Sequence, residues 1–128
     1  MASVKAFPKA KAGGKIVMVV DDEPDIRETM KALLRRNGYS VVLAKSAEDC
    51  LEKLKAHKPS LVLMDIMMPG KSVREAIAKM PKQKIIFVSV VRVSEAEKED
   101  LLNHPNVVGF IQKPFELRDL VEMVKKHA

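Results

Sequence analysis

Residues Ile16–Pro24 read IVMVVDDEP, and residues 61–70 read LVLMDIMMPG. In each stretch a short run of apolar residues ends abruptly at aspartate. Such a run, bounded by turn signals, is typical of a strand that is buried on both faces. Because strands of this kind occur mainly in parallel sheets covered by helices, the two stretches predict two central strands, Ile16–Val20 and Leu61–Met64.

The rest of the chain alternates three further apolar strands with five amphipathic helices. The additional strands are predicted at Ser40–Ala44, Ile85–Val90 and Val107–Ile111. The helices are predicted at Asp25–Asn37, after Ser46, after Ser72, over Ser94–His104 and from Leu117, the last one marked as amphipathic by Leu117, Leu120, Val121 and Val124. Alternating strands and helices with right-handed crossovers leave few topologies. We therefore predict an α/β, doubly wound (βα)5 fold with a five-stranded parallel sheet in the order 2-1-3-4-5, which is flavodoxin-like.

Several helix boundaries have recognisable capping residues. Pro24 suits a first helical turn, and Gly38 suits a left-handed helix end. Three serine–acid pairs spaced three residues apart predict helix N-termini: Ser46 with Asp49, Ser72 with Glu75 and Ser94 with Glu97.

Composition indicates one soluble globular domain. The 128 residues are 47% hydrophobic and 31% charged, and no apolar run approaches the roughly 20 residues needed to span a bilayer. The N-terminus lacks the apolar core of a secretory signal. The single cysteine, Cys50, excludes an intrachain disulfide and is expected to pack in the core. We expect a cytoplasmic protein.

The net charge of +6 is unevenly distributed. Lys5, Lys9, Lys11 and Lys15 supply much of the excess, and no acid accompanies them. We expect residues 1–14 to form a flexible basic tail and residues 15–128 to form the domain. A solubilising leader or expression remnant is the favoured interpretation of the tail, and a weak tether to an anionic partner is the alternative. We expect neither direct nucleic-acid binding nor membrane insertion.

Chemically active side chains follow the strands at their carboxyl ends, where open parallel sheets bind ligands. Asp21 and Asp22 follow the first strand, Asp65 the third, Ser89 stands at the end of the fourth, and Lys113 comes shortly after the fifth. The first and third strands are neighbours in the predicted order, so three carboxylates crowd together and repel one another. A hard divalent cation such as Mg²⁺ resolves that conflict.

This set of side chains suits phosphoryl transfer. Asp65 can act as the nucleophile, the metal and Lys113 can neutralise the transferring group, and Ser89 can donate a hydrogen bond to it. Each residue alone also has an ordinary explanation: a helix N-terminus, a turn aspartate, a strand serine or a solvated lysine. Those explanations do not account for all of them falling on one sheet edge.

Four motifs resemble the receiver domain of two-component response regulators. They are Ile16–Pro24, Leu63–Gly70 (LMDIMMPG), Ser89, and residues 109–115 (GFIQKPF), and the resemblance runs from about Lys15 to the end of the chain. The resemblance implies that Asp65 accepts a phosphoryl group from a sensor histidine kinase or histidine phosphotransfer protein. The domain would then catalyse only its own phosphorylation and dephosphorylation and would not be a turnover enzyme.

The resemblance also implies individual roles. Asp22 and Asp65 would bind Mg²⁺ directly, with Mn²⁺ as a substitute, Asp21 would act through water, and the backbone carbonyl of Met67 would complete the protein ligands. Lys113 would be the phosphoryl counter-ion, preceding a cis bond to Pro114. Ser89 and Phe110 would be the switch pair. The face formed by the fourth predicted helix, the fifth strand and the fifth helix would then relay the signal to a downstream protein or a linked output domain.

The sequence departs from the family pattern in two places. Residues 70–72 run directly into a helix, so the segment after Pro69 is short, and Val90 stands where the family has a small residue. Val90 is expected to narrow access to Asp65. Because of these departures, an alternative function stays open: the domain would be a phosphorelay intermediate or a phosphate sink.

Two other functions on the same fold fit the sequence less well. A hydrolase with an aspartyl-phosphate intermediate needs a cap over the substrate, and no insertion is long enough to form one. A non-phosphorylated binding module is expected to lack the acid pair or the lysine, and both are present. A stand-alone regulator and a receiver cut from a longer protein remain equally open.

Overall fold

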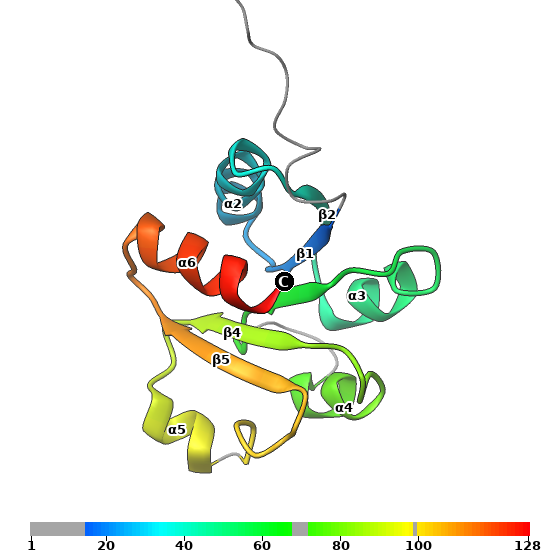
Figure 1. Cartoon of the computed structure of the whole chain (residues 1–128). Coiled ribbons are helices and arrows are strands. Elements are labelled where there is room, and N and C mark those ends of the chain that lie inside the picture. Colours follow the sequence, from blue (N-terminus) through cyan, green and yellow to red (C-terminus); the bar gives the residue numbers. More distant parts are fainter. Residues whose placement is uncertain (1–14, 68–71, 99) are drawn as a thin grey trace, which may run out of the picture.

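The structure is a computed structural model, and it describes residues 15–67, 72–98 and 100–128. Within these ranges five parallel strands form one sheet: β1 (Ile16–Val20), β2 (Ser40–Ala44), β3 (Leu61–Met64), β4 (Ile85–Ser89) and β5 (Val107–Gln112). Their order is β2-β1-β3-β4-β5 (Figure 1). The predicted fold and strand order are confirmed. The predicted tail and the segment after Pro69 lie outside the described residues.

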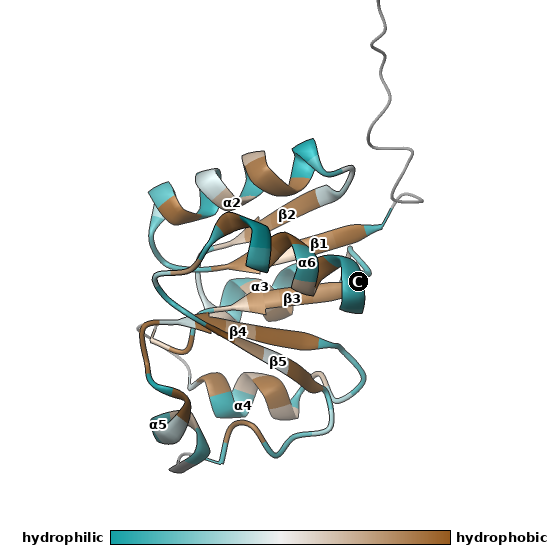
Figure 2. Cartoon of the chain, turned by 60° about the vertical axis from the view of Figure 1, so that its left-hand side comes forward, coloured by the Kyte–Doolittle hydropathy of each residue, from teal (hydrophilic) through white to brown (hydrophobic). Residues whose placement is uncertain are grey.

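Helices cover both faces of the sheet, because successive side chains of each strand point to opposite faces. The helices are α2 (Pro24–Arg36), α3 (Ala47–Lys53), α4 (Val73–Ala78), α5 (Val93–Lys98) and α6 (Leu117–His127). Val17 and Val19 pack in one cluster with residues of α2 and α6, whereas Met18 and Val20 pack in another with residues of α3 and α4. Figure 2 shows the resulting apolar strands between helices whose outer surfaces are hydrophilic.

The ends of α2 and α3 follow the predicted capping chemistry. Pro24 begins α2, and Gly38 adopts a φ of 92° beyond its end. Ser46 accepts a hydrogen bond of 3.0 Å from the backbone N–H of Asp49, whose carboxylate accepts another from Lys45. Cys50 lies on the inner face of α3 and is fully buried, as expected.

The predictions for α4 and α5 were only partly right. Ser72 caps α4, because its hydroxyl accepts a hydrogen bond from the backbone N–H of Arg74. The cap therefore uses Arg74 and not the predicted partner, Glu75. The predicted helix Ser94–His104 is much shorter and begins at Val93, so Ser94 lies inside it and is not its cap. The chain turns at Asp100, whose φ is 61°, and this turn brings Leu101 back into the core. Beyond this turn Leu101 packs with the core cluster that includes residues of α3 and α4.

Two apolar residues of the predicted elements are exposed, and the predicted fourth strand is one residue too long. Val90 lies beyond the end of β4 and is 57% exposed. Leu117 begins α6 and is 52% exposed, although Leu120 and Val124 of the same helix are buried as predicted. Both residues follow the carboxyl ends of strands, Val90 directly after β4 and Leu117 five residues after β5. None of the helices within the described ranges has the length and apolar character needed to cross a bilayer.

Candidate functional site

The carboxyl edge of the sheet brings two of the predicted aspartates side by side. Val20 of β1 pairs with Met64 of β3, so the next residues, Asp21 and Asp65, leave the sheet at the same level. The backbone continues the ladder one step further, since the N–H of Asp65 donates to the carbonyl of Val20 at 3.0 Å. The register of β1 and β3 therefore places the carboxylates of Asp21 and Asp65 next to each other.

The three acids form a candidate metal site. Asp21, Asp22 and Asp65 each offer a carboxylate oxygen, and these oxygens lie within 4.8 Å of one another. Two oxygens bound to one Mg²⁺ at about 2.1 Å lie at most about 4.2 Å apart, so the group needs only small adjustments to hold the ion. Asp21 and Asp65 are 3% and 6% exposed, whereas Asp22 is exposed. The site therefore has a buried floor and an open side from which a cation can enter.

Lys113 bridges two of these acids. Its Nζ atom lies 3.0 Å from Oδ2 of Asp21 and 3.4 Å from Oδ2 of Asp65. Burial disfavours the ammonium, but its hydrogen bonds and charge interactions with Asp21 and Asp65 outweigh that effect and raise the pKa of Lys113. Lys113 is therefore a cation at neutral pH and offsets much of the repulsion between the two buried carboxylates.

Backbone geometry positions Lys113. Its N–H donates to the carbonyl of Ser89 at 2.8 Å, which ties the segment after β5 to the end of β4. The peptide bond between Lys113 and Pro114 is cis, as the family resemblance implied.

Each buried aspartate has one oxygen held by the backbone and the other directed at Lys113. Oδ1 of Asp65 accepts from the N–H of Met67 at 3.0 Å, and Oδ1 of Asp21 accepts from the N–H of Glu23 at 2.9 Å. The guanidinium of Arg27 also donates to the carbonyl of Asp21 at 2.6 Å. Sequence reasoning missed this arginine. The only signal was a basic side chain in the early turns of a helix that follows an acid pair.

Ser89 and Phe110 lie on adjacent strands and on the same face of the sheet. In the pairing of β4 with β5, Ser89 lies opposite Gln112 and Phe87 lies opposite Phe110. Phe87 precedes Ser89 by two residues and so points to the same face, as does its partner Phe110. Ser89 is fully buried, and its hydroxyl accepts a 3.3 Å hydrogen bond from the N–H of Val91. The hydroxyl is therefore engaged within its own loop, and Phe110 packs partly buried against the α3–α4 side of the core.

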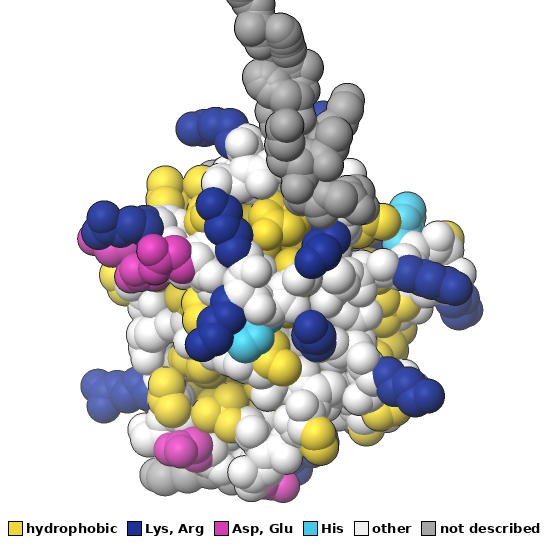
Figure 3. All heavy atoms as spheres, viewed as in Figure 1, with side chains coloured by type: hydrophobic (Ala, Val, Ile, Leu, Met, Phe, Trp, Pro, Cys, Tyr) yellow, Lys and Arg dark blue, Asp and Glu magenta, His cyan; other side chains and the backbone are white. Residues whose placement is uncertain are grey.

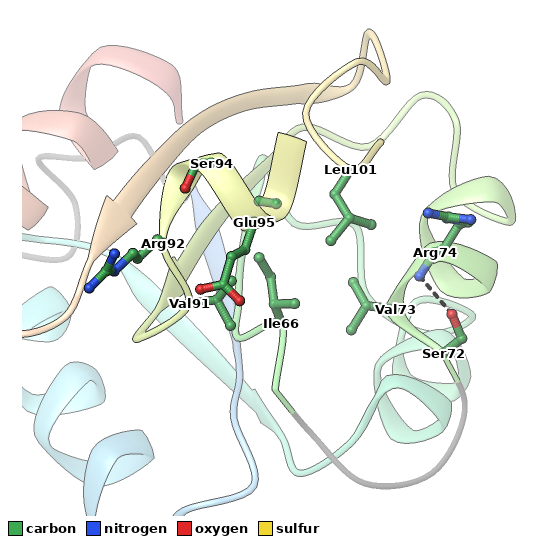
Figure 4. Close-up of a pocket in the computed structure, with 10 residues that line it drawn as sticks. Ile66, Ser72, Val73, Arg74, Val91, Arg92, Ser94, Glu95 and Leu101 are labelled. Atoms are coloured by element: carbon green, nitrogen blue, oxygen red, sulfur yellow. Dashed lines mark hydrogen bonds between the residues drawn. The ribbon is translucent and has the colours of Figure 1, made fainter. Parts of the chain in front are cut away.

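A pocket of about 760 Å³ lies between α4 and α5, next to the site. Ile66, which follows Asp65, points into it together with Val73 and Leu101, and Glu95 of α5 lies at its margin (Figure 4). The residue that directly follows Asp65 in sequence thus shares this pocket with residues of α4 and α5.

Comparison with known proteins agrees with this geometry. The model of the response regulator receiver domain family matches residues 17–125. The alkaline phosphatase synthesis transcriptional regulatory protein PhoP of Bacillus subtilis (strain 168) is 30% identical over 118 residues. That match covers 87% of this chain but 47% of the relative, so the chain spans about half the length of this curated protein.

Solved structures show the same fold. The response regulator TrrA of Thermotoga maritima, determined in complex with Mg²⁺-BeF, is 33% identical with a TM-score of 0.78, and the match covers 89% of this chain and 99% of TrrA. A response regulator receiver protein from Pseudomonas putida is 31% identical with a TM-score of 0.79, covering 88% and 97% of the two chains. The family match over most of the chain and the acidic pocket at the carboxyl edge of the sheet lead to one conclusion: this chain belongs to the response regulator receiver domain family of two-component signalling.

Proposed function

We propose that this receiver domain is a Mg²⁺-dependent phosphoryl switch in which Asp65 accepts the phosphoryl group. The donor is a sensor histidine kinase or a histidine phosphotransfer protein. One observation carries the assignment: of the two clustered aspartates that contact Lys113, Asp65 is the one that follows the central strand β3, whereas Asp21 follows β1. Its carboxylate is buried, yet it adjoins the exposed Asp22 on the open side of the site.

The acids supply a suitable set of oxygen ligands for the cation. Asp22, Asp65 and the backbone carbonyl of Met67 would hold Mg²⁺ directly and Asp21 through water, with Mn²⁺ as a substitute. When bound, the cation neutralises negative charge on the phosphoryl oxygens. The mutual closeness of the three carboxylates makes a cation at this point electrostatically favourable.

The protein's own part in the reaction follows from Asp65 and Lys113. A carboxylate oxygen of Asp65 attacks phosphorus, an O–P bond forms, and the P–N bond to the donor imidazole breaks as that nitrogen takes the electron pair. Lys113 moves from Oδ2 of Asp21 toward the equatorial phosphoryl oxygens, whose charge it offsets. Later attack of water at phosphorus breaks the O–P bond, releases inorganic phosphate and restores the carboxylate of Asp65. No separate substrate is turned over, so the domain modifies only itself.

Signal output is proposed to pass through the face formed by α5, β5 and α6. The hydroxyl of Ser89 would leave Val91 and donate to the phosphoryl group, and Phe110 would pack into the space that opens. The pocket between α4 and α5 leaves room for α5 to move. The recipient is a downstream protein or a linked output domain, with neither direct nucleic-acid contact nor membrane insertion, and the expected location is the cytoplasm.

Labelling by a small acyl-phosphate donor tests the acceptor. In the presence of Mg²⁺, the parent protein should gain the mass of one phosphoryl group, and Asp65→Asn should gain none while keeping its folded circular dichroism spectrum. Asp119→Asn, which changes an exposed acid on α6, is the matched control and should label normally. Full labelling of Asp65→Asn would reject the assignment. Absence of labelling in the parent would instead favour a non-phosphorylated binding module.

A further inference from the structure

The amino edge of the sheet, opposite the phosphoryl site, carries a concentrated positive charge. All strands are parallel, so their first residues meet at one edge, and the helices that return the chain end there too. Nine exposed residues at this edge form what we call the basic edge: Lys15, Arg35, Arg36, Lys58, Lys79, Lys82, Lys84, Lys125 and Lys126. Residues 35–40, 57–60, 79–84 and 125–128, which contain eight of them, include no aspartate or glutamate.

Direct contacts tie part of the basic edge to the end of α6. Nζ of Lys15 lies 2.9 Å from the main-chain oxygen of Ala128, and Nζ of Lys84 lies 2.9 Å from that of His127. Two lysines from the starts of β1 and β4 thus converge on the helix turn that carries Lys125 and Lys126. In Figure 3, with the C-terminus toward the viewer, Lys and Arg side chains spread over this side and acids are few.

Ordinary helix capping explains only part of this charge. Cations at helix C-termini are favoured by the helix dipole, which accounts for residues such as Arg36 and Lys126. Lys58 and Lys82 instead lie in loops that lead into β3 and β4. Neither side chain forms a hydrogen bond or ion pair with another described residue. The charges of these two lysines therefore repel the other cations of the basic edge, and no ion pair within the described residues offsets that repulsion.

The opposite edge carries the opposite charge. Residues 21–28, 45–49 and 113–119, which follow β1, β2 and β5 at their carboxyl ends, contain nine acids and four lysines or arginines. The molecule therefore has a strong charge separation along the strand direction. Near an anionic surface such a dipole turns the basic edge toward the surface and the acidic pocket away from it.

We propose that the basic edge binds the anionic lipid headgroups of a membrane surface. The nine cations come from the starts of strands and from helices on both faces of the sheet, so they form a patch that is broad in two dimensions. A charged bilayer contacts such a patch all at once, whereas a nucleic-acid duplex contacts a narrow strip. Seven of the nine are lysines, point charges without the planar fork that arginine offers to individual phosphates.

The contact is peripheral and does not require insertion. The exposed large hydrophobic residues among the described ones, Met67, Val90, Val93 and Leu117, all lie at the carboxyl edge. None of these exposed hydrophobic residues lies at the basic edge, so the attraction to the membrane is electrostatic. At 0.1 M salt this attraction decays over a Debye length of about 10 Å. Docked in this way, the domain keeps the open side of its phosphoryl site facing the solution.

Vesicle co-sedimentation of the full chain tests the proposal. Vesicles of phosphatidylcholine with phosphatidylglycerol should bind the protein at about 0.1 M salt, and phosphatidylcholine alone should not. Each lysine near the surface contributes roughly fivefold in affinity, so Lys58→Glu with Lys82→Glu should weaken binding at least about 25-fold. The matched control, Arg92→Glu with Arg118→Glu, changes the net charge equally at the carboxyl edge and should retain most of the binding.

Lysine footprinting supplies an independent measurement on the unmodified chain. Acetylation on the mixed vesicles should slow at Lys58, Lys82 and Lys126 but not at Lys45, which lies at the opposite edge. Three results would overturn the proposal: no binding to the mixed vesicles, equal losses in the two double variants, or tighter binding to duplex DNA than to the vesicles. The last result would assign the basic edge to a nucleic acid.

Discussion

Replacing Lys113 with methionine should destabilise the metal-free domain strongly. The substitution keeps the length of the side chain but removes the cation that lies 3.0 Å and 3.4 Å from two carboxylates. Removing one partner of a buried ion pair costs about 3–5 kcal/mol. Because the site opens to solvent beside Asp22, we expect the lower end, about 3 kcal/mol, which corresponds to a decrease in Tm of about 10 °C for a domain of this size.

Thermal and urea unfolding in chelator-treated buffer measure this effect. Lys31→Met is the matched control, because its ion pair with the exposed Glu28 is long, at 3.9 Å, and Lys31 itself is partly exposed, so the loss of the pair should cost less than about 0.5 kcal/mol. The raised pKa of Lys113 fixes the pH dependence: its contribution is complete below the ordinary value of 10.5 and disappears as pH rises through the higher folded-state pKa. Mg²⁺ should stabilise the variant more than the parent. Equal stability of variant and parent without metal would refute this account of the site.

Three further measurements follow from the same geometry. Millimolar Mg²⁺ should raise the Tm of the parent, and Asp22→Ala should remove most of that increase; an unchanged parent Tm would argue against the metal site. Beryllofluoride should shift backbone NMR signals at Ser89, in α5 and at Phe110, and Ser89→Ala should suppress the distant shifts; shifts confined to the loops around Asp65 would indicate a phosphorelay intermediate or phosphate sink. Burial, together with the charge of Asp49, raises the pKa of Cys50 to about 12, so iodoacetamide at pH 8 should alkylate the native protein far more slowly than the unfolded one; rapid alkylation would show that this part of the core opens readily.

Sequence patterns predicted the frame of this domain because its main determinants are local. An apolar run that stops at Asp21 or Asp65 marks both a buried strand and its carboxyl end, and Gly38 marks a left-handed helix end. Once strands and helices alternate, chain connectivity restricts the sheet order. The location of the acidic cluster follows from that order and requires no knowledge of side-chain packing.

Features that depend on the packing of distant segments were not predictable in this way. α5 ends at Lys98, before the buried Leu101, and Leu117 is exposed at the start of α6 although it belongs to an amphipathic helix. The periodicity of apolar residues predicts which face of a helix is apolar. It does not predict which residues of that face are covered by the rest of the protein. The donation from Arg27 to the carbonyl of Asp21 likewise depends on the angle at which α2 leaves β1.

The internal partners of the proposed switch residues limit how strongly phosphorylation can bias the domain. Lys113 already bridges two carboxylates, and the hydroxyl of Ser89 already accepts from Val91, so a phosphoryl group gains only the difference between the new contacts and these existing ones. The Ser89 contact is long, at 3.3 Å, and a neutral hydrogen bond contributes about 0.5–1.5 kcal/mol, so releasing it costs little. Releasing Lys113 costs more, unless Mg²⁺ has taken over the neutralisation of Asp21. Metal binding should therefore precede and permit the motion of Lys113, and the resulting coupling of about 1–3 kcal/mol shifts a population between two states instead of locking one.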